Sequence, residues 1–266
     1  MDWSLLLLRA ALLCYVLGFL VTFVPLLTGA HRPPPLTGWM VLLGAGLHTA
    51  ALVALGVRLG RCPLETLPEV LSAVAWASVL VYLGVAWRYR LAVLHIIVLP
   101  LVLVVLFISN LLPAGFMPVS EGLRIPVLRV HLTAIILAVA GLLVTFAASL
   151  VYVLVDRTLK LKRPARFFLS LPSLEKCDAV GQASLLWAFP LLTFGIITGA
   201  IVSASLYGTF WAWQPRENLA ILAWAILGTV LVARLGWGWR GRKPAILTLC
   251  GVCALLMRMI GVYLGA

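Results

Sequence analysis

Long apolar runs, each separated from the next by a short polar or proline-bearing break, set the pattern along this chain. A helix that crosses a membrane needs about 20 mostly apolar residues, whereas the strands of a membrane β-barrel alternate apolar and polar positions. The runs therefore predict an all-α, polytopic membrane helical bundle of about eight transmembrane helices. The expected helices cover residues 3–29, 37–57, 67–87, 91–112, 126–155, 179–205, 217–235 and 245–264.

Proline-bearing breaks end these runs, as at RPPP (residues 32–35) and LLPAGFMP (residues 111–118). No repeat of 20–50 residues and no hinge divides the chain, so we interpret residues 1–266 as a single membrane domain. The first run is too long for a signal-peptide core and is expected to be a retained span. Small residues inside the runs, such as Gly195 with Gly199, predict close helix packing.

Composition agrees with this picture, because 64% of the residues are apolar, the mean hydropathy is +1.14 and only eight residues are acidic. The formal charge of +12 reflects basic residues that collect in alternate connections. The positive-inside rule then places both termini outside and residues 156–176 in the cytoplasm as a basic loop. We expect a multi-pass protein of a bacterial inner (plasma) membrane, in contact with the lipid bilayer and with no nucleic acid as partner.

The five cysteines do not suggest a disulfide framework, because most of them fall within predicted spans. Cys250 and Cys253 form a C-x-x-C pair inside the last apolar run. A redox-active pair usually needs a lowered thiol pKa and access to a partner. We favour the alternative that both are small helix-packing residues.

Ionisable side chains within the runs are few, and an intramembrane ionisable residue is a candidate functional residue. His48 is expected near the middle of the second helix, and His131 near the outer end of the fifth. A neutral imidazole can bind a metal or haem iron through one ring nitrogen. The alternative for each is a histidine satisfied by a neighbouring helix. His31 is expected in a cytoplasmic turn, and His95 is expected to snorkel toward the inner interface.

The connection before the seventh helix, YGTFWAWQPRE (residues 207–217), is unusually aromatic. An aromatic belt at the lipid headgroups is one interpretation. The other is a binding site, because Pro215 and Glu217 favour a helix start that would hold the aromatic rings rigidly. Arg216 could then pair with a carboxylate such as a haem propionate.

This segment resembles the hallmark motif WGxxWxWDPKE of the cytochrome c assembly family, the CcsA, CcmC and HemX-like membrane proteins. The resemblance extends to GRCPLETLPEVLSAVAWASVLVYLGVAWRYR and to LEKCDAVGQASLLWAFPLLTFGIITGA. In that family the motif is a haem platform at the outer surface, with flanking histidines as axial ligands. The chain thus looks like a divergent HemX-like member.

The resemblance implies roles for individual residues. Trp211 and Trp213 match the motif as walls of a haem site, and Arg216 replaces a lysine of the same charge as propionate partner. His131 matches the outer histidine that precedes the motif, and His48 looks like a histidine of the HemX-like branch. Both are therefore implied as candidate iron ligands.

Several positions depart from the family pattern. Gln214 replaces the motif aspartate, Tyr207 replaces the first tryptophan, and Val232 stands where a histidine is expected. The sequence also ends at Ala266, before a further outer histidine that the resemblance implies. A complete pair of histidine ligands cannot be transferred from the family.

These features predict an inner-membrane protein of cytochrome c assembly that binds or handles haem b near the outer face, without independent catalytic activity. Its expected partners are haem and other cytochrome c assembly proteins or a membrane complex. The alternative is a HemX-like regulatory or accessory protein of tetrapyrrole metabolism, or of a larger membrane complex, without its own haem. In that case the basic loop would be its docking surface. A small transporter is disfavoured, because no inverted repeat is visible and no acidic residue lies near the centre of a span.

Overall fold

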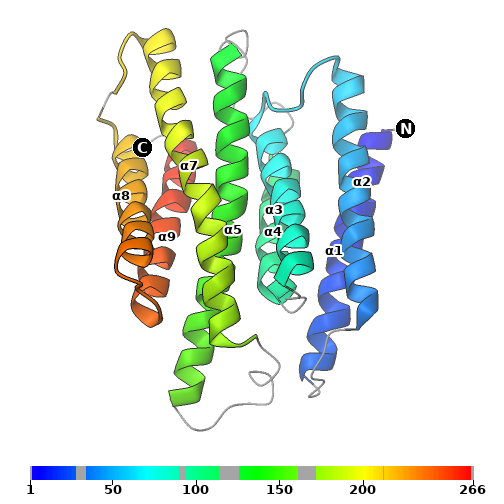
Figure 1. The fold of residues 1–266 in the computed structure, drawn as a ribbon. Helices are drawn as coiled ribbons and strands as arrows, with labels where there is room; N and C mark the ends of the chain where they lie inside the picture. Colours follow the sequence, from blue (N-terminus) through cyan, green and yellow to red (C-terminus); the bar gives the residue numbers. More distant parts are fainter. Residues whose placement is uncertain are drawn as a thin grey trace. The chain divides into compact units, whose positions relative to one another are not determined.

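The structure is a computed structural model that describes residues 2–27, 34–89, 94–113, 126–160, 172–211 and 213–264 (Figure 1). These residues form eight α-helices, which confirms the predicted all-α class. The helices are α1 (Trp3–Leu27), α2 (Pro35–Leu59), α3 (Leu67–Tyr89), α4 (His95–Leu111), α5 (Pro126–Lys160), α7 (Leu174–Tyr207), α8 (Pro215–Gly236) and α9 (Arg242–Leu264).

Six of these helices contain stretches long and apolar enough to cross a membrane, counted over the described residues. They are Trp3–Val24, Leu36–Leu59, Leu67–Tyr89, Pro126–Lys160, Leu174–Ser205 and Glu217–Gly236. Helix α4 is apolar but shorter, with 17 residues. The chain is therefore a multi-pass membrane protein. The side of the membrane on which its termini lie stays a prediction.

The helices group into two compact units. The first comprises Met1–Ser120 with Thr158–Pro172, and the second comprises Glu121–Arg157 with Ser173–Ala266. Each unit is described by itself below. The interpretation of the chain as a single membrane domain stays a prediction.

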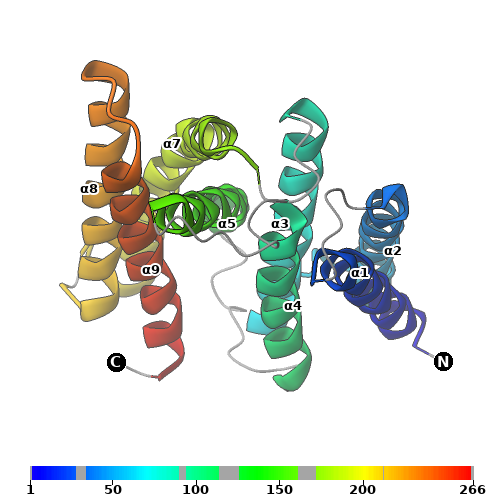
Figure 2. The same ribbon diagram turned by 90° about the horizontal axis from the view of Figure 1, so that it is seen from below.

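The first unit is built on two helix pairs, α1 with α2 and α3 with α4. Contacts of α1 with α4 and of α2 with α3 join the pairs (Figure 2). Glycine lets α1 and α2 approach closely, because a Cβ atom on Gly44 would lie only 2.6 Å from the Tyr15 ring. Small residues thus serve close helix packing in this unit, as the sequence predicts.

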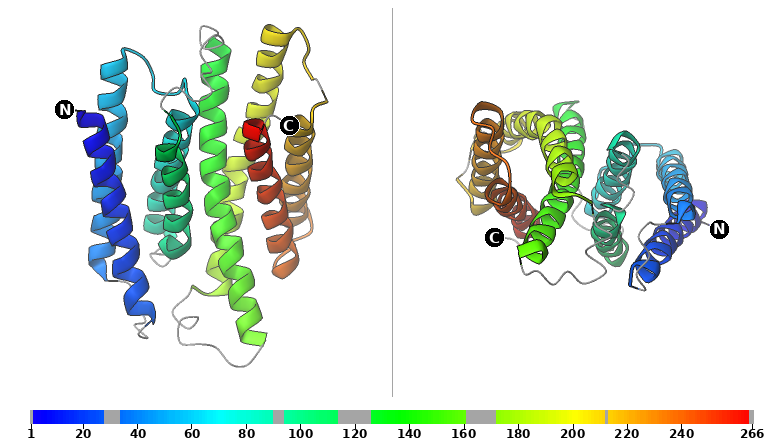
Figure 3. Two further views of the ribbon diagram at one scale, coloured as in Figure 1. Left: turned by 180° about the vertical axis from the view of Figure 1, so that it is seen from behind. Right: turned by 60° about the horizontal axis from the view of Figure 1, so that its bottom comes forward.

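The second unit contains most of α5 together with α7, α8 and α9, and Figure 3 shows α8 beside α9. Glycine again permits close contact, because a Cβ on Gly141 would lie 2.4 Å from the ring of Trp187. A buried ion pair joins α7 to α8, with Arg234 Nη1 donating to Asp178 Oδ1 at 2.8 Å. The two charges pair where water has little access, and the Arg234 Nε is buried beside them without a hydrogen-bond partner.

The connection from α2 to α3 is fixed by Glu69. Its Oε2 accepts hydrogen bonds from the backbone N–H groups of Glu65 (2.7 Å) and Thr66 (3.3 Å), which satisfies donors at the start of α3. Arg61 donates to both Glu69 carboxylate oxygens at 2.9 Å. These hydrogen bonds raise the pKa of Arg61 above its ordinary value. The carboxylate therefore holds a helix start and a cation together.

We predict that Glu69→Gln lowers the free energy of unfolding by about 1–3 kcal/mol, because it removes a charged acceptor that serves both backbone and side-chain donors. Glu65→Gln is the matched control. Glu65 also pairs with Arg61, at 3.0 Å, but its side chain is 27% exposed, and such pairs contribute about 0–1 kcal/mol. Thermal unfolding in detergent measures both variants. Equal losses would contradict the role assigned to Glu69.

Candidate functional site

His131 lies in the second turn of α5, half-buried against α7. Its Nδ1 atom is 2.8 Å from the carbonyl oxygen of Gly195 and 3.3 Å from the hydroxyl of Thr198. A carbonyl oxygen only accepts hydrogen bonds, so Nδ1 carries the proton and donates it. The lone pair of the neutral ring is then on Nε2.

The Nε2 atom of His131 has no hydrogen-bond partner within the described residues. It is also not among the fully buried polar atoms that lack a partner. The atom is therefore not fully enclosed by the protein. A histidine that binds a metal almost always donates its other ring N–H to a carbonyl or carboxylate, and His131 has this arrangement through Gly195.

Gly199 leaves room for the His131 ring. A Cβ atom at this position would lie 2.9 Å from Cε1 of the ring and 3.3 Å from Nδ1, closer than any side chain tolerates without a shift. From the sequence, Gly195 and Gly199 are only helix-packing residues. The structure adds a contact of both with the imidazole, which a pattern of small residues cannot reveal without knowing what faces it.

A positively charged side chain lies near the His131 ring. Arg258 of α9 lies close enough for its charge to act on the His131 ring. A lone arginine in an apolar run is equally explained by snorkelling, so the sequence pattern alone does not mark Arg258 as a functional residue.

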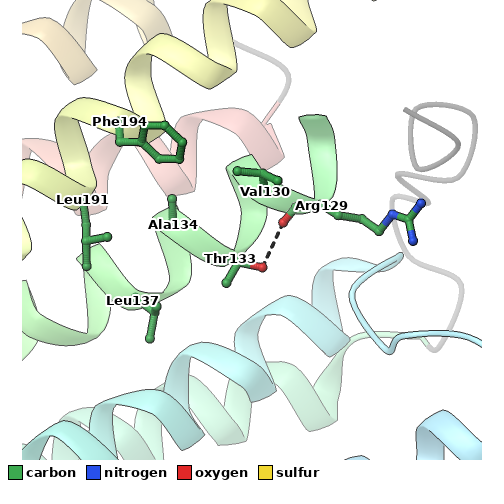
Figure 4. Close-up of a pocket in the computed structure, with 7 residues that line it drawn as sticks. All are labelled: Arg129, Val130, Thr133, Ala134, Leu137, Leu191 and Phe194. Carbon is green, nitrogen blue, oxygen red and sulfur yellow. Dashed lines mark hydrogen bonds between the residues drawn. The ribbon is translucent and has the colours of Figure 1, made fainter. Parts of the chain in front are cut away.

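A shallow pocket of about 370 Å³ opens on α5 and α7 (Figure 4). Its lining is mostly apolar, and the Arg129 guanidinium extends away from the apolar side chains at one end. The lining residues are Arg129, Val130, Thr133, Ala134, Leu137, Leu191 and Phe194. The pocket could accept an apolar group close to a positive charge.

The tryptophan-rich segment follows α7 directly. Helix α7 ends at Tyr207, with Gly208 in the left-handed conformation (φ 72°), and α8 begins at Pro215 as predicted. The Gln214 carbonyl accepts hydrogen bonds from the backbone N–H groups of Glu217 (2.9 Å) and Asn218 (3.1 Å). The segment is therefore clamped between two well-formed helix ends.

Most of the described aromatic rings of this segment are exposed on the protein surface. Trp213 is 77% exposed and Phe210 is 68% exposed, whereas Trp211 is half-buried. Trp213 has φ 55° and is the one residue other than glycine with positive φ in the described part of the chain. This conformation costs an L-residue roughly 1–2 kcal/mol, and such strain often marks functional positions.

Two side chains that the sequence pattern does not mark stabilise the backbone of this segment. Asn218 Nδ2 donates to the Trp213 carbonyl at 3.3 Å, and Ser203 Oγ donates to the Thr209 carbonyl at 2.8 Å. The side chain of Arg216 lies outside what the structure describes, so its pairing with a carboxylate stays a prediction.

The segment and His131 belong to the same unit. Gly199, against the His131 ring, precedes Tyr207 by eight residues, a rise of roughly 12 Å along α7. The histidine thus lies about two turns below the loop that carries the tryptophans.

His48 belongs to the first unit and is fully buried. Its Nε2 lies 3.0 Å from the Ser72 hydroxyl, and its Nδ1 lies 3.5 Å from the hydroxyl of Tyr15. Both ring nitrogens are therefore engaged by neighbouring helices. Iron ligation by His48 stays a prediction, and it would require the ring to give up one of these contacts.

His95 is also in the first unit and is only 1% exposed, so the expectation that it snorkels is wrong. Its Nε2 lies 2.6 Å from the Thr22 hydroxyl, which donates its own proton to the Gly18 carbonyl, while Nδ1 lies 3.2 Å from the Tyr82 hydroxyl. Partners on α1 and α3 make an inward position more favourable than an interfacial one. His31 lies outside the described residues.

All five cysteines are described, and each is a free thiol in the structure. Cys250 and Cys253 are exposed on α9, so the interpretation of both as helix-packing residues is wrong. Their side chains lie on the outward face of the helix rather than against its neighbours.

Comparison with known proteins agrees with this geometry. Residues 64–265 match the profile of the cytochrome c assembly protein family. This match covers well over half of the chain. The chain belongs to the cytochrome c assembly protein family.

Several cyanobacterial relatives carry the name cytochrome c biogenesis protein CcsA. The protein from Synechococcus sp. (strain CC9902) is 30% identical, and the match covers 87% of this chain and 84% of that protein. The protein from Prochlorococcus marinus (strain MIT 9303) is 28% identical, and the match covers 86% of each chain. That from Parasynechococcus marenigrum (strain WH8102) is 29% identical, covering 85% of this chain and 82% of its own length.

Membership of the cytochrome c assembly protein family confirms the resemblance drawn from YGTFWAWQPRE. It identifies the chain as a membrane protein of cytochrome c biogenesis that handles haem, which is the function that the sequence predicts.

The contact between Gly199 and His131 predicts a structural cost for Gly199→Ala. The added methyl group would displace the imidazole, and overpacking of this kind costs about 1–3 kcal/mol of stability. Gly46→Ala is the matched control, since a Cβ there meets no atom within 4 Å and alanine favours a helix. Thermal unfolding measures both. An unchanged midpoint for Gly199→Ala would show that the ring is not confined there.

Proposed function

We propose that this protein holds haem b near the outer face of a bacterial inner (plasma) membrane, with His131 as axial ligand of the iron. The observation that carries the proposal is the hydrogen bonding of the described histidines. His48 and His95 have both ring nitrogens engaged, whereas His131 keeps Nε2 available and has its Nδ1 proton fixed by Gly195. Haem, when bound, supplies an iron atom that takes a nitrogen lone pair and two carboxylates that take cations.

The surroundings of His131 fit the remaining parts of haem. Trp211 and Trp213 supply aromatic walls, and the exposed ring of Trp213 is free to stack on a flat macrocycle. Arg216 is the proposed partner of a propionate, with Arg258 as a further cation close to the imidazole. Each of these residues belongs to the second unit.

His48 is proposed only as a second ligand, for a haem within the first unit. Ligation there would replace the hydrogen bond between Nε2 and Ser72. The two candidate ligands belong to different compact units, so each is tested by itself.

The proposed role is to hold and present haem rather than to catalyse a reaction alone. The relatives' name, cytochrome c biogenesis protein, supports other proteins of that process as partners. We propose the basic segment of residues 156–176, which the positive-inside rule predicts to be cytoplasmic, as a surface where such a partner docks. Electrostatic attraction by clustered Lys and Arg supports this assignment.

The absorption spectrum of the protein purified in mild detergent after haem-replete expression tests the proposal. Wild type is expected to show a Soret band. The variant His131→Gly should lose it, because the imidazole that binds the iron is removed, while Gly195 and Thr198 around the vacated position are unchanged. Added imidazole should restore the band in His131→Gly by occupying the vacated ligand position. His95→Gln is the control and should keep the band, since an amide can replace its hydrogen bonds.

A parallel variant, His48→Gln, tests whether His48 binds a second haem iron. A partial loss of the Soret band would support ligation by His48. If wild type carries no haem, the proposal fails and the accessory role without haem is favoured. If His131→Gly keeps an unchanged spectrum, the protein handles haem but His131 is not its ligand.

The exposed ring of Trp213 predicts a second effect. Trp213→Gly keeps the left-handed backbone conformation and removes the ring, so the haem dissociation constant should rise about tenfold, the loss of one aromatic contact. Trp237→Ala is the control, because that ring is 73% exposed but follows α8 instead of preceding it. Haem titration measures both. Equal weakening in the two variants would contradict a specific role for Trp213.

A further inference from the structure

The segment GWGWRGRKP (residues 236–244), which joins α8 to α9, contains a second W-x-W sequence that the proposed haem site does not include. Its backbone is folded tightly onto the end of α8. The N–H groups of Trp237 and Trp239 both donate to the Ala233 carbonyl at 3.1 Å. Gly238 (φ 64°) and Gly241 (φ 101°) adopt conformations that favour glycine. The turn is thus a fixed scaffold for the side chains it carries.

These side chains combine exposed aromatic rings with positive charge. Trp237 is 73% exposed and Trp239 is 41% exposed. Arg240, Arg242 and Lys243 are exposed as well, and no hydrogen bond or ion pair joins their side chains to another residue in the described ranges. Large rings and unpaired cations side by side call for a ligand with both an apolar and an anionic part.

The position of the turn identifies the environment. The apolar stretch Glu217–Gly236 has 20 residues, a length of about 30 Å, which matches the hydrocarbon thickness of a bilayer. The turn begins directly after it, and so lies where hydrocarbon meets headgroups. Tryptophan is enriched at this depth, and Lys and Arg attract anionic lipids there.

A cavity next to the turn is a poor site for the anionic part of such a ligand. This cavity of about 380 Å³ is lined by Arg240 but also by the carboxylates of Glu175 and Asp178. Asp178 is neutralised by Arg234, whereas Glu175 would repel a phosphate. An anion is therefore better placed away from this cavity, next to Arg242 and Lys243.

We propose that Trp237, Trp239, Arg240, Arg242 and Lys243 form a binding surface for an anionic phospholipid. The phosphate of the headgroup pairs with Arg242 and Lys243, Arg240 adds positive charge beside them, and the two indole rings lie at the boundary with the acyl chains. Charge complementarity and the end of the apolar span favour this occupant. The inference is independent of the proposed haem site, which uses the segment before α8.

The full-length protein in neutral detergent, titrated with short-chain phosphatidylglycerol or phosphatidylcholine, tests the surface. Phosphatidylglycerol should raise the unfolding midpoint, because a ligand that binds the folded state stabilises it. Its apparent dissociation constant should be at least about tenfold below that of phosphatidylcholine, because the cations favour the anionic headgroup. The variant Arg240→Gln/Arg242→Gln/Lys243→Gln should lose this preference. Inorganic phosphate, the third arm, should give no comparable shift.

The matched control is Lys162→Gln/Arg163→Gln/Arg166→Gln, which removes three charges from the predicted cytoplasmic loop and should keep the preference. Equal losses in the two triple variants, or a stabilisation by inorganic phosphate as large as that by phosphatidylglycerol, would overturn the assignment. Loss of haem binding in the first triple variant with an unchanged lipid preference would assign the surface to a tetrapyrrole instead.

A second measurement needs no charge variant. Brominated phosphatidylglycerol should quench the tryptophan fluorescence of wild type more than brominated phosphatidylcholine does, and Trp237→Phe/Trp239→Phe should reduce the difference. Equal quenching by the two lipids would also overturn the proposal.

Discussion

Within a bilayer, where water is scarce, an imidazole ring must find its hydrogen bonds inside the protein. This constraint separates the histidines of the chain. His48 and His95 are satisfied on both ring nitrogens by hydroxyl groups from neighbouring helices, so each ties helices of the first unit together. His131 is satisfied on one nitrogen only. The same residue type is thus a core element in one unit and a candidate ligand in the other.

Close packing of α5 on α7 makes that difference possible. Glycine removes the side chains that would keep the two helices apart, and Gly199 leaves the space that the His131 ring occupies. The Gly195 carbonyl then comes within hydrogen-bonding distance and fixes which nitrogen carries the proton. Packing in lipid, where small residues replace the hydrophobic drive, therefore also prepares the chemistry of the site.

Helix α8 carries aromatic turns at both ends, and they differ in what surrounds the rings. Before the helix, Trp213 adopts a strained conformation braced by Asn218, close in the chain to the helix that holds His131. After the helix, Trp237 and Trp239 are surrounded by exposed cations. The first turn is the proposed contact for a flat macrocycle, and the second is the proposed contact for a lipid headgroup.

The sequence by itself determined the helices, their number, the helix start at Pro215 and the family, because apolar run length, proline position and the motif are local in the chain. It could not determine which histidine keeps a nitrogen free. The hydrogen-bond partners of His48, His95 and His131 lie 24, 73 and 64 residues away, on other helices. Only tertiary packing brings those hydroxyl and carbonyl groups to the rings. The exposure of Cys250 and the burial of His95 were decided in the same way, by which neighbouring helix covers each face.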